Sequence, residues 1–524
     1  MATAVVIGTV IGSGVFKKPH DVAKNLTEFG LIMIAWVLVG VLSFIGSLIL
    51  AEVAIIHPRA GGNYAFLREG YGRWAGFLWG WVEFWIIRSG SIAALATVFS
   101  ETFHDVLRFI NDVRPPAEVL TFWQRQGVTI AVITVLAFVN ARGTAIGGGL
   151  QLVITVVKVG SLLAIALLPF VFLASANSAV VHTEFLDPVW PEDWAGVNWS
   201  LFGKALVGIL WAYHGWMNLA PVAEEVEEPN RNLPLAFMLG TLSVIVLYVS
   251  VNVAYHLIVS RADMIALGGD SPVATIFSFR LFGSIGLLLA SLAVMISVFG
   301  ALNGNLLVGP RLLYAMGQDN LAPEGLSQLH PTYGTPARAT AVLAGWSILL
   351  VIGAAFLMAN SILKKALFDI LTDYAMFGAV AFETLAVATI FVCRAQYPVD
   401  KVDLPYRCWG YPWLPIVYIG AMALVLINMF VTDLLQSLIA VGFIGVGAGV
   451  YAVMVNVRTL PYFLFGACAI PAGAAGASFV WTDSPLMPEW SAFFAIVFGL
   501  GTVALPIVVR MELGGKEVPT DQTL

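Results

Sequence analysis

The sequence is poor in the residues that build metal centres, disulfide frameworks and charged binding faces. Only 11% of its 524 residues are charged, and the net charge of −6 forms no acidic or basic block, so nucleic acid is not an expected partner. The three cysteines, Cys393, Cys408 and Cys468, have neither metal-ligand spacing nor the pattern of a disulfide framework. The seven histidines show no HExxH or similar spacing, so we expect no metal site.

Motifs of cofactor-dependent enzymes are missing as well. Gly12-Ser13-Gly14 completes neither GxGxxG nor a P-loop, because Lys17 stands where the third glycine would be and no GK[ST] follows. We therefore expect neither an enzyme nor a cofactor. The first twenty residues lack the basic region of a cleavable signal peptide. Only seven residues precede Gly8, about two helical turns, so we expect a trimmed or misassigned start.

Apolar residues are what the sequence has in excess. They make up 59% of the chain, and the mean hydropathy is +0.88. A soluble domain cannot bury so much apolar surface, and a β-barrel would show short alternating segments, so the sequence predicts an all-α polytopic protein in a lipid bilayer. With about 20 residues per span, we predict fourteen segments, near 2–25, 31–56, 75–101, 126–142, 149–174, 202–222, 233–259, 282–308, 338–358, 367–393, 412–432, 434–456, 460–481 and 490–510.

Two of these segments contain a break. The first reads GTVIGSGVF from Gly8 to Phe16, and each glycine there costs about 1 kcal/mol of helix propensity relative to alanine. The sixth reads GILWAYHGWMNLAP from Gly208 to Pro221. If 1–175 and 200–394 are two inverted repeats of five segments each, the breaks correspond and indicate a binding site at the membrane midplane. The remaining parts would be 411–457, two further helices in 458–510 and a tail, 511–524.

The two breaks offer complementary backbone chemistry. A helix that restarts after Gly14 points free N–H groups and a positive dipole end at the cavity, which suits a carboxylate. The half-helix that ends near Trp211 and Tyr213 presents free carbonyls, which suit an ammonium group. Together they fit the backbone of an α-amino acid. The predicted substrate-binding residues are Ile11, Gly12, Ser13, Gly14, Trp211, Ala212, Tyr213, His214, Gly215 and Asn218.

Side chains beside the second break would select the substrate. Trp211 and Tyr213 could form an aromatic lid or wall, with ordinary packing as the alternative. His214 and Asn218 could add polar contacts. A histidine beside a helix break needs a partner, although His214 could also cap a freed carbonyl.

Lys158 stands alone in the apolar fifth segment, and a lysine inside a membrane predicts a functional role. Near the first break its ammonium would take the place of a coupling cation or change protonation during the cycle. The alternative is a fixed charge that satisfies backbone carbonyls. Glu52, Glu83, Arg88 and Glu383 also lie in apolar runs, and we expect structural roles for them, with Glu52 and Arg88 as a pair.

The distribution of basic residues favours a cytoplasmic N-terminus and, with an even number of spans, a cytoplasmic C-terminus. The predicted outer loop around 175–200 holds four acidic residues and neither lysine nor arginine. Lys17, Lys18 and Lys24 are exceptions, because in this orientation they lie on the outer side of the membrane. We predict an integral protein of the plasma (inner) membrane.

Four stretches resemble a known family: GTVIGSGVF (8–16), GGNYAFLREGYG (61–72), EEVEEPNRNLP (224–234) and the run from Asn303 through RLLYAMGQDNLAPEGLSQLHPTYGTPARA (311–339). With WAYHGW (211–216), they are similar to the amino acid–polyamine–organocation superfamily, and within it to the L-type amino acid transporters and their bacterial relatives. The likeness covers residues 1 to about 456. It implies a five-plus-five inverted-repeat core with discontinuous helices one and six, transport by alternating access, and Trp211 as a gate. In sodium-independent relatives a fifth-helix lysine lies near the place of a sodium ion, and Lys158 matches it.

Three departures from that family limit the resemblance. Residues 102–125 contain no cysteine for a heavy-chain disulfide, so a covalently linked partner is not expected. Four helices after the core, about fourteen in all, exceed the usual twelve and are similar to the cationic amino acid transporter branch. His214 stands where many relatives carry glycine or aspartate, so substrate choice cannot be carried over.

The sequence thus predicts a secondary amino acid transporter. Neutral substrates are favoured because the predicted pocket offers no carboxylate to a basic side chain. Exchange and proton symport both fit Lys158, whereas sodium coupling fits it poorly. One alternative is a permease for cationic amino acids or polyamines, with Asp373 or Glu83 facing the cavity. Another is a non-transporting amino acid sensor, which would need a larger signalling domain than the tail after Arg510.

Overall fold

A computed structural model describes residues 2–58, 60–112, 118–174, 180–267, 271–360, 367–398 and 404–455. Within these ranges the chain is helical and contains no β-strand. Ten of the described helical runs are long and apolar enough to cross a membrane. The predicted class, an all-α polytopic membrane protein, is therefore confirmed.

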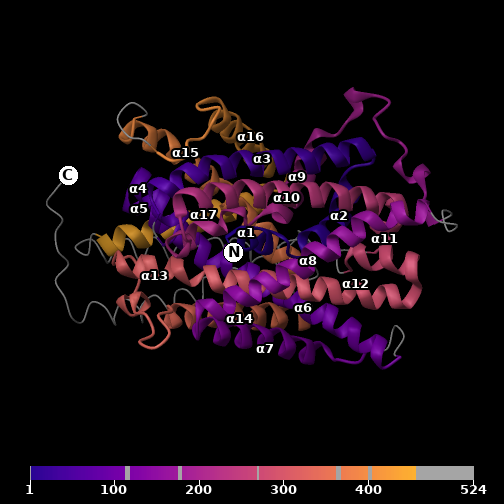
Figure 1. The fold of residues 1–524 in the computed structure, drawn as a ribbon, viewed down its shortest axis with the longest axis horizontal. Coiled ribbons are helices and arrows are strands. Elements are labelled where there is room, and N and C mark those ends of the chain that lie inside the picture. Colours follow the sequence, from indigo (N-terminus) through magenta and orange to yellow (C-terminus); the bar gives the residue numbers. More distant parts are fainter. Residues whose placement is uncertain are drawn as a thin grey trace, which may run out of the picture.

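Nine long helices follow the predicted order within the described ranges, and one of them, α12, has a kink at Gly283. They are α3 (Phe29–Ile56), α7 (Phe122–Ala141), α8 (Thr144–Leu173), α10 (Pro229–Ile258), α12 (Val273–Val308), α14 (Ala337–Ala359), α15 (Leu367–Gln396), α16 (Trp413–Thr432) and α17 (Leu434–Val455). In Figure 1 they run along the long axis of the bundle, with α1 in its middle and α7 and α14 at one edge. Short elements fill the connections: α4 (Asn63–Tyr71), α11 (Arg261–Ala266), α13 (Pro310–Gln318), η3 (Thr183–Leu186), η4 (Trp194–Gly196) and η6 (Glu324–Ser327). The predicted spans 460–481 and 490–510 lie outside the described residues.

The two predicted breaks are present. The first span consists of α1 (Ala2–Val10) and α2 (Gly14–Asn25), separated by three non-helical residues. The sixth consists of α9 (Trp199–Tyr213) and a 3-10 helix, η5 (Trp216–Glu225). Gly215 joins these halves with φ at +116°, a left-handed conformation that favours glycine. Pro221 lies inside η5 and does not end it.

The third span, predicted at 75–101, is one continuous helical run over Arg73–Ile110 with a π-helical turn inside it. It is built from α5 (Arg73–Val82), a π-helical turn η1 (Glu83–Arg88) and α6 (Ser89–Ile110). The wider turn buries both Glu83 and Arg88, which are 2% and 6% exposed. Such π-helical turns occur frequently at functional sites.

The α8 helix shows how the sequence pattern directs one face inward. Gln151, Thr155, Lys158 and Leu162 are buried at helical spacing, whereas Val156 and its outward neighbours are exposed. Buried polar groups therefore face the bundle, and apolar groups face the bilayer. This arrangement carries Lys158 to α1, which α8 contacts.

Two of the stretches that suggested the family also meet in space. GGNYAFLREGYG forms α4, and Asp319 follows α13 directly. The Tyr64 hydroxyl donates to the Asp319 carboxylate at 2.6 Å, Arg68 pairs with the same carboxylate, and Arg73 donates to the Asp319 carbonyl at 2.7 Å. Burial, and then the bond to Asp319, raises the pKa of Tyr64, so this contact keeps its proton at neutral pH.

Candidate functional site

A cavity of about 380 Å³, part of it open to solvent, lies between the two breaks. Its wall comes from α1 and the break after it, α6, α9, η5 and α12. The lining residues are Thr9, Val10, Gly12, Ser13, Gly14, Ser91, Leu95, Trp211, His214, Asn218, Ala301 and Asn305. Six of the ten predicted substrate-binding residues are among them, while Ile11, Ala212, Tyr213 and Gly215 lie behind the wall.

The first break presents an unsatisfied helix end to this cavity. The amides of Phe16 and Lys17 both donate to the Ser13 carbonyl, at 3.2 and 3.0 Å. The amides before them, in the first turn of α2, are the donors that a helix N-terminus leaves without an intrahelical acceptor. The Ser13 hydroxyl is buried and has no hydrogen-bond partner within the described residues. This end of α2 can therefore receive an anion.

The second break touches the first through backbone. A Cβ added to Gly14 would lie 2.4 Å from the Cα and 2.7 Å from the Cβ of Ala212. Gly14 is thus required for the contact between α2 and α9, a reason that the sequence pattern does not reveal. A larger residue at this position would meet Ala212 first.

Three hydrogen bonds join the ends of the two broken spans. The Tyr248 hydroxyl lies 3.1 Å from the Val10 carbonyl and 3.2 Å from the Ala212 carbonyl. Thr9 donates to the Gly215 carbonyl at 3.1 Å. Some of the carbonyls predicted to bind an ammonium group therefore already accept a hydrogen bond. The Ala212 carbonyl accepts from Tyr248, and the Trp211 carbonyl accepts from the His214 amide at 3.2 Å.

Lys158 lies where the interrupted α1 leaves its last carbonyls. Its side chain is fully buried, and its ammonium donates to the carbonyls of Gly8 at 2.8 Å and Ile11 at 2.6 Å. Ser297 of α12 donates to the Gly12 carbonyl at 3.1 Å. The lysine thus satisfies backbone carbonyls that the break exposes. This contact is the one expected from the interpretation of Lys158 as a fixed charge.

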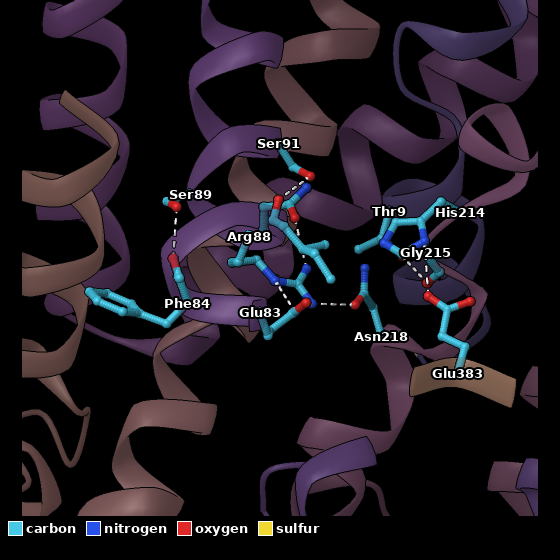
Figure 2. Close-up of polar contacts among 12 residues, drawn as sticks. Thr9, Glu83, Phe84, Arg88, Ser89, Ser91, His214, Gly215, Asn218 and Glu383 are labelled. Carbon is cyan, nitrogen blue, oxygen red and sulfur yellow. Dashed lines mark hydrogen bonds and ion pairs between the residues drawn. The ribbon is translucent and has the colours of Figure 1, made fainter. Parts of the chain in front are cut away.

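Arg88 lies beside the cavity and is fully engaged. Its guanidinium donates to Glu83 at 2.8 Å, to Asn305 at 2.7 Å and to Asn218 at 2.8 Å. Figure 2 shows it between Glu83 and Asn218, with His214 and Glu383 on the far side of Asn218. Asn218 also lines a second cavity beyond Arg88, with Gly61 and Pro221 among its other walls, so this cluster separates two cavities.

The predicted pair of Glu52 and Arg88 is wrong. Glu52 lies 2.6 Å from Nε of Arg394 and accepts the Cys408 amide at 2.6 Å, so it ties α3 to α15 and to the loop before α16. The π-helical turn instead brings Arg88 to Glu83 of its own span. Both carboxylates are nearly inaccessible, which explains why each has a cationic partner.

His214 has the partner that its position at a helix break required. Its Nδ1 lies 3.1 Å from Oε1 of Glu383 on α15, and its ring is nearly parallel to that of Trp211, with centroids 6.2 Å apart. Tyr213, in contrast, is buried against Trp36 and Tyr248 and forms no part of the wall. The side chain of Asp373 lies outside the described residues.

Sequence reasoning missed the wall that comes from unbroken helices. Ser91 and Leu95 of α6 and Ala301 and Asn305 of α12 line the cavity. A signal for Asn305 existed, because an asparagine in an apolar run needs a polar neighbour. Ser91, Leu95 and Ala301 are ordinary residues of a membrane helix, and only the packing assigns them.

Comparisons with known proteins find a matching family and several relatives. The model of the amino acid permease family matches residues 1–448. The serine/threonine exchanger SteT of Bacillus subtilis (strain 168) is 31% identical over 443 residues, 82% of this chain and 90% of that protein. The b(0,+)-type amino acid transporter 1 of Mus musculus is 28% identical over 390 residues, 74% of each chain, and the cystine/glutamate transporter of Homo sapiens is 28% identical over 395 residues, 75% and 73% of the two chains.

Proposed function

The chain belongs to the amino acid permease family and is a secondary amino acid transporter, and we propose that it carries neutral amino acids by alternating access. The observation that carries this proposal is the meeting of two opposite helix ends at one cavity, with Gly14 of α2 against Ala212 of α9. One end presents amides and the other presents carbonyls. A zwitterion complements both without a charged side chain in the membrane.

In this proposal the substrate carboxylate binds the amides of Gly12, Ser13 and Gly14 and the Ser13 hydroxyl. The ammonium binds the carbonyl end of α9, formed by Trp211, Ala212 and Tyr213, where the carbonyls of Trp211 and Ala212 would accept it as a second donor. Ile11, Ala212 and Gly215 act through backbone, because their side-chain positions lie behind the wall. Trp211 acts as the gate over the bound substrate.

The preference for neutral side chains follows from how the charges near the cavity are compensated. Glu83 is paired with Arg88, and Glu383 lies behind His214, so neither carboxylate lines the cavity where it could hold a cationic side chain. A cationic amino acid or a polyamine would have to displace one of these partners. The name of the serine/threonine exchanger is compatible with a neutral substrate here.

Lys158 serves in this proposal as a built-in cation that replaces a driving sodium ion. Its two carbonyl contacts support that role, because they lie at the break itself. Amino acid exchange and proton-coupled uptake both remain compatible with a fixed ammonium. The residue ranges 1–175 and 200–394 would be the two inverted repeats that move relative to each other.

We further propose a plasma membrane location with both termini cytoplasmic and no disulfide-linked heavy chain. Residues 102–125 contain no cysteine, and Cys393 and Cys408 are buried. Buried thiols are poorly placed for a bond to another chain.

Uptake into proteoliposomes tests the proposed function. Purified protein would be reconstituted, and entry of labelled L-serine, L-leucine, L-glutamate and L-lysine measured with and without internal amino acid and with and without a pH gradient. We expect uptake of the neutral amino acids to exceed that of the charged ones. Uptake of none of the four under any condition would overturn the proposal.

A further inference from the structure

His214 is the one titratable side chain among the described residues that line the central cavity. Glu383 lies directly behind it, and the two side chains are 13% and 10% exposed. Oε1 of the carboxylate lies 3.1 Å from Nδ1, an ion-pair distance when the ring is protonated, so Nε2 is the ring nitrogen further from Glu383. Nε2 has no hydrogen-bond partner within the described residues. It is also not one of their fully buried side-chain atoms that lack a partner. Figure 2 shows Glu383 reaching His214 from the α15 ribbon.

The other ionisable groups around this pair are already engaged or stay protonated. On α8, Lys158 is bound to carbonyls, and on η1, Arg88 is neutralised by Glu83. The phenol of Tyr418 on α16 faces Glu383, and that of Tyr213 precedes His214; phenols ordinarily keep their protons to about pH 10.

Among the side chains that the structure describes, the remaining charged groups on α3 and α15 lie further along those helices. Glu52 of α3 is paired with Arg394 of α15. Arg394 lies eleven positions beyond Glu383 in the sequence, roughly 16 Å along a helix. Imidazole is the side chain that ordinarily changes charge between pH 5 and 8. His214 is the one imidazole among the described residues of the cavity wall.

We propose that His214 and Glu383 form a proton-binding site that competes with the ammonium group of the substrate. This inference rests on the proposed function, which places that ammonium at the end of α9, next to His214 in the chain. In the empty cavity Glu383 stabilises the imidazolium. When the zwitterion binds, two cations would share one small cavity, so the imidazolium loses its Nε2 proton to water and the substrate takes its place. One proton is released for each amino acid bound, so the substrate ammonium replaces the imidazolium as the cation beside Glu383, and the substrate carboxylate lowers the net charge of the cavity by one.

Linkage between the two ligands fixes the direction of the pH dependence. Because the complex holds fewer protons than the empty protein, affinity rises with pH through the titration of His214 and is constant above it. A single competing proton changes Kd by at most tenfold per pH unit. Without the Glu383 charge the imidazolium is less favoured, so the change in affinity moves to lower pH.

Binding measurements with the purified full-length chain test this site. Kd for L-serine and L-leucine would be measured from pH 5.5 to 8.0, and proton release followed with a pH dye in weak buffer. We expect wild-type Kd to weaken as the pH falls from 7.5 to 5.5, by at most tenfold per pH unit, with up to one proton released. His214→Gln and His214→Gly should have a Kd that is constant over this range and release no proton. Glu383→Gln should shift the change in Kd to lower pH.

The chain offers a matched control in a second histidine–carboxylate pair. His182 lies 2.8 Å from Glu184 in the exposed segment before α9, so His182→Gln should keep the wild-type pH profile. Thermal melting would confirm that each variant is folded. A wild-type protein that transports both amino acids with a pH-independent Kd would overturn the proton site and leave the proposed function standing. A pH profile retained in both His214 variants but lost in Lys158→Ala would also overturn it, whereas absence of binding and uptake at every pH would refute the proposed function itself.

Discussion

The contact between Gly14 and Ala212 makes a prediction whose size follows from the structure. In Gly14→Ala the new methyl group would lie 2.4 Å from the Ala212 Cα, whereas an ordinary contact begins at about 3.4 Å. Because the obstacle is backbone, α2 and α9 must separate by about 1 Å. Overpacking of this kind costs about 1–3 kcal/mol, and the same separation disturbs both ends of the substrate site. We expect a lower melting temperature and a Kd for L-leucine about 5- to 150-fold weaker.

Gly12 provides the matched control two residues away. A methyl group there would lie 3.4 Å from both Ala301 and Leu95, within ordinary contact distance. Gly12→Ala should therefore melt close to the wild type, although its methyl group enters the cavity wall. Melting would be followed by intrinsic fluorescence and Kd by scintillation proximity. A Gly14→Ala protein with wild-type melting and Kd, or equal losses of stability in both variants, would refute the proposed contact.

Two further predictions concern buried groups around the site. Arg88→Ala leaves Glu83 buried without its cation, at a cost of about 3–5 kcal/mol, so this variant should melt well below the wild type. Adding Glu83→Ala should recover part of the lost stability. A double variant no more stable than Arg88→Ala would contradict the pairing of Arg88 with Glu83. Burial and the nearby Glu52 carboxylate raise the pKa of the Cys408 thiol to about 12. In a variant that retains Cys408 as its sole cysteine, iodoacetamide at pH 8 should react about a thousandfold more slowly than with a free thiol, and labelling at the free-thiol rate would show that this loop is open.

Local chemistry explains which parts of the site the sequence could predict. Gly12-Ser13-Gly14 interrupts an apolar run by its own propensity, so the break and its orphan amides follow from a few adjacent residues. The position of Lys158 was predictable for a similar reason, since an intramembrane ammonium requires acceptors and the break supplies them. The identity of the helices also followed, because an apolar run of the right length has few alternatives in a bilayer.

Pairings over long distances were not predictable in the same way. Glu52 and Arg394 are 342 positions apart, and nothing in either helix specifies the other. Arg88 and Glu83 are five positions apart. Side chains at this spacing lie on the same face of a π-helical turn, whereas in an α-helix the pairs that meet are three or four positions apart. The sequence left open whether Tyr213 forms part of an aromatic lid or packs in the core. In the structure it packs against Trp36.

The charge of Lys158 has a consequence for the carboxylate site that neither feature has alone. The end of α1 carries a partial negative charge, which would repel a carboxylate bound only three residues further on, at the start of α2. Lys158 binds the Gly8 and Ile11 carbonyls and cancels that charge, so the positive end of α2 acts unopposed. The lysine should thus favour the carboxylate of the substrate more than its ammonium.

Lys158→Ala tests this through two ligands that differ in the carboxylate. L-leucine and isoamylamine share the side chain and the amine, so the ratio of their affinities isolates the anion. Loss of a helix-end charge interaction of up to about 2 kcal/mol should lower that ratio by about 3- to 30-fold and slow uptake. Lys204→Ala is the control, because that ammonium is half exposed and pairs with Asp433 at 3.3 Å. If Lys158→Ala weakens both ligands equally, the lysine only holds the break together, and the carboxylate is selected without it.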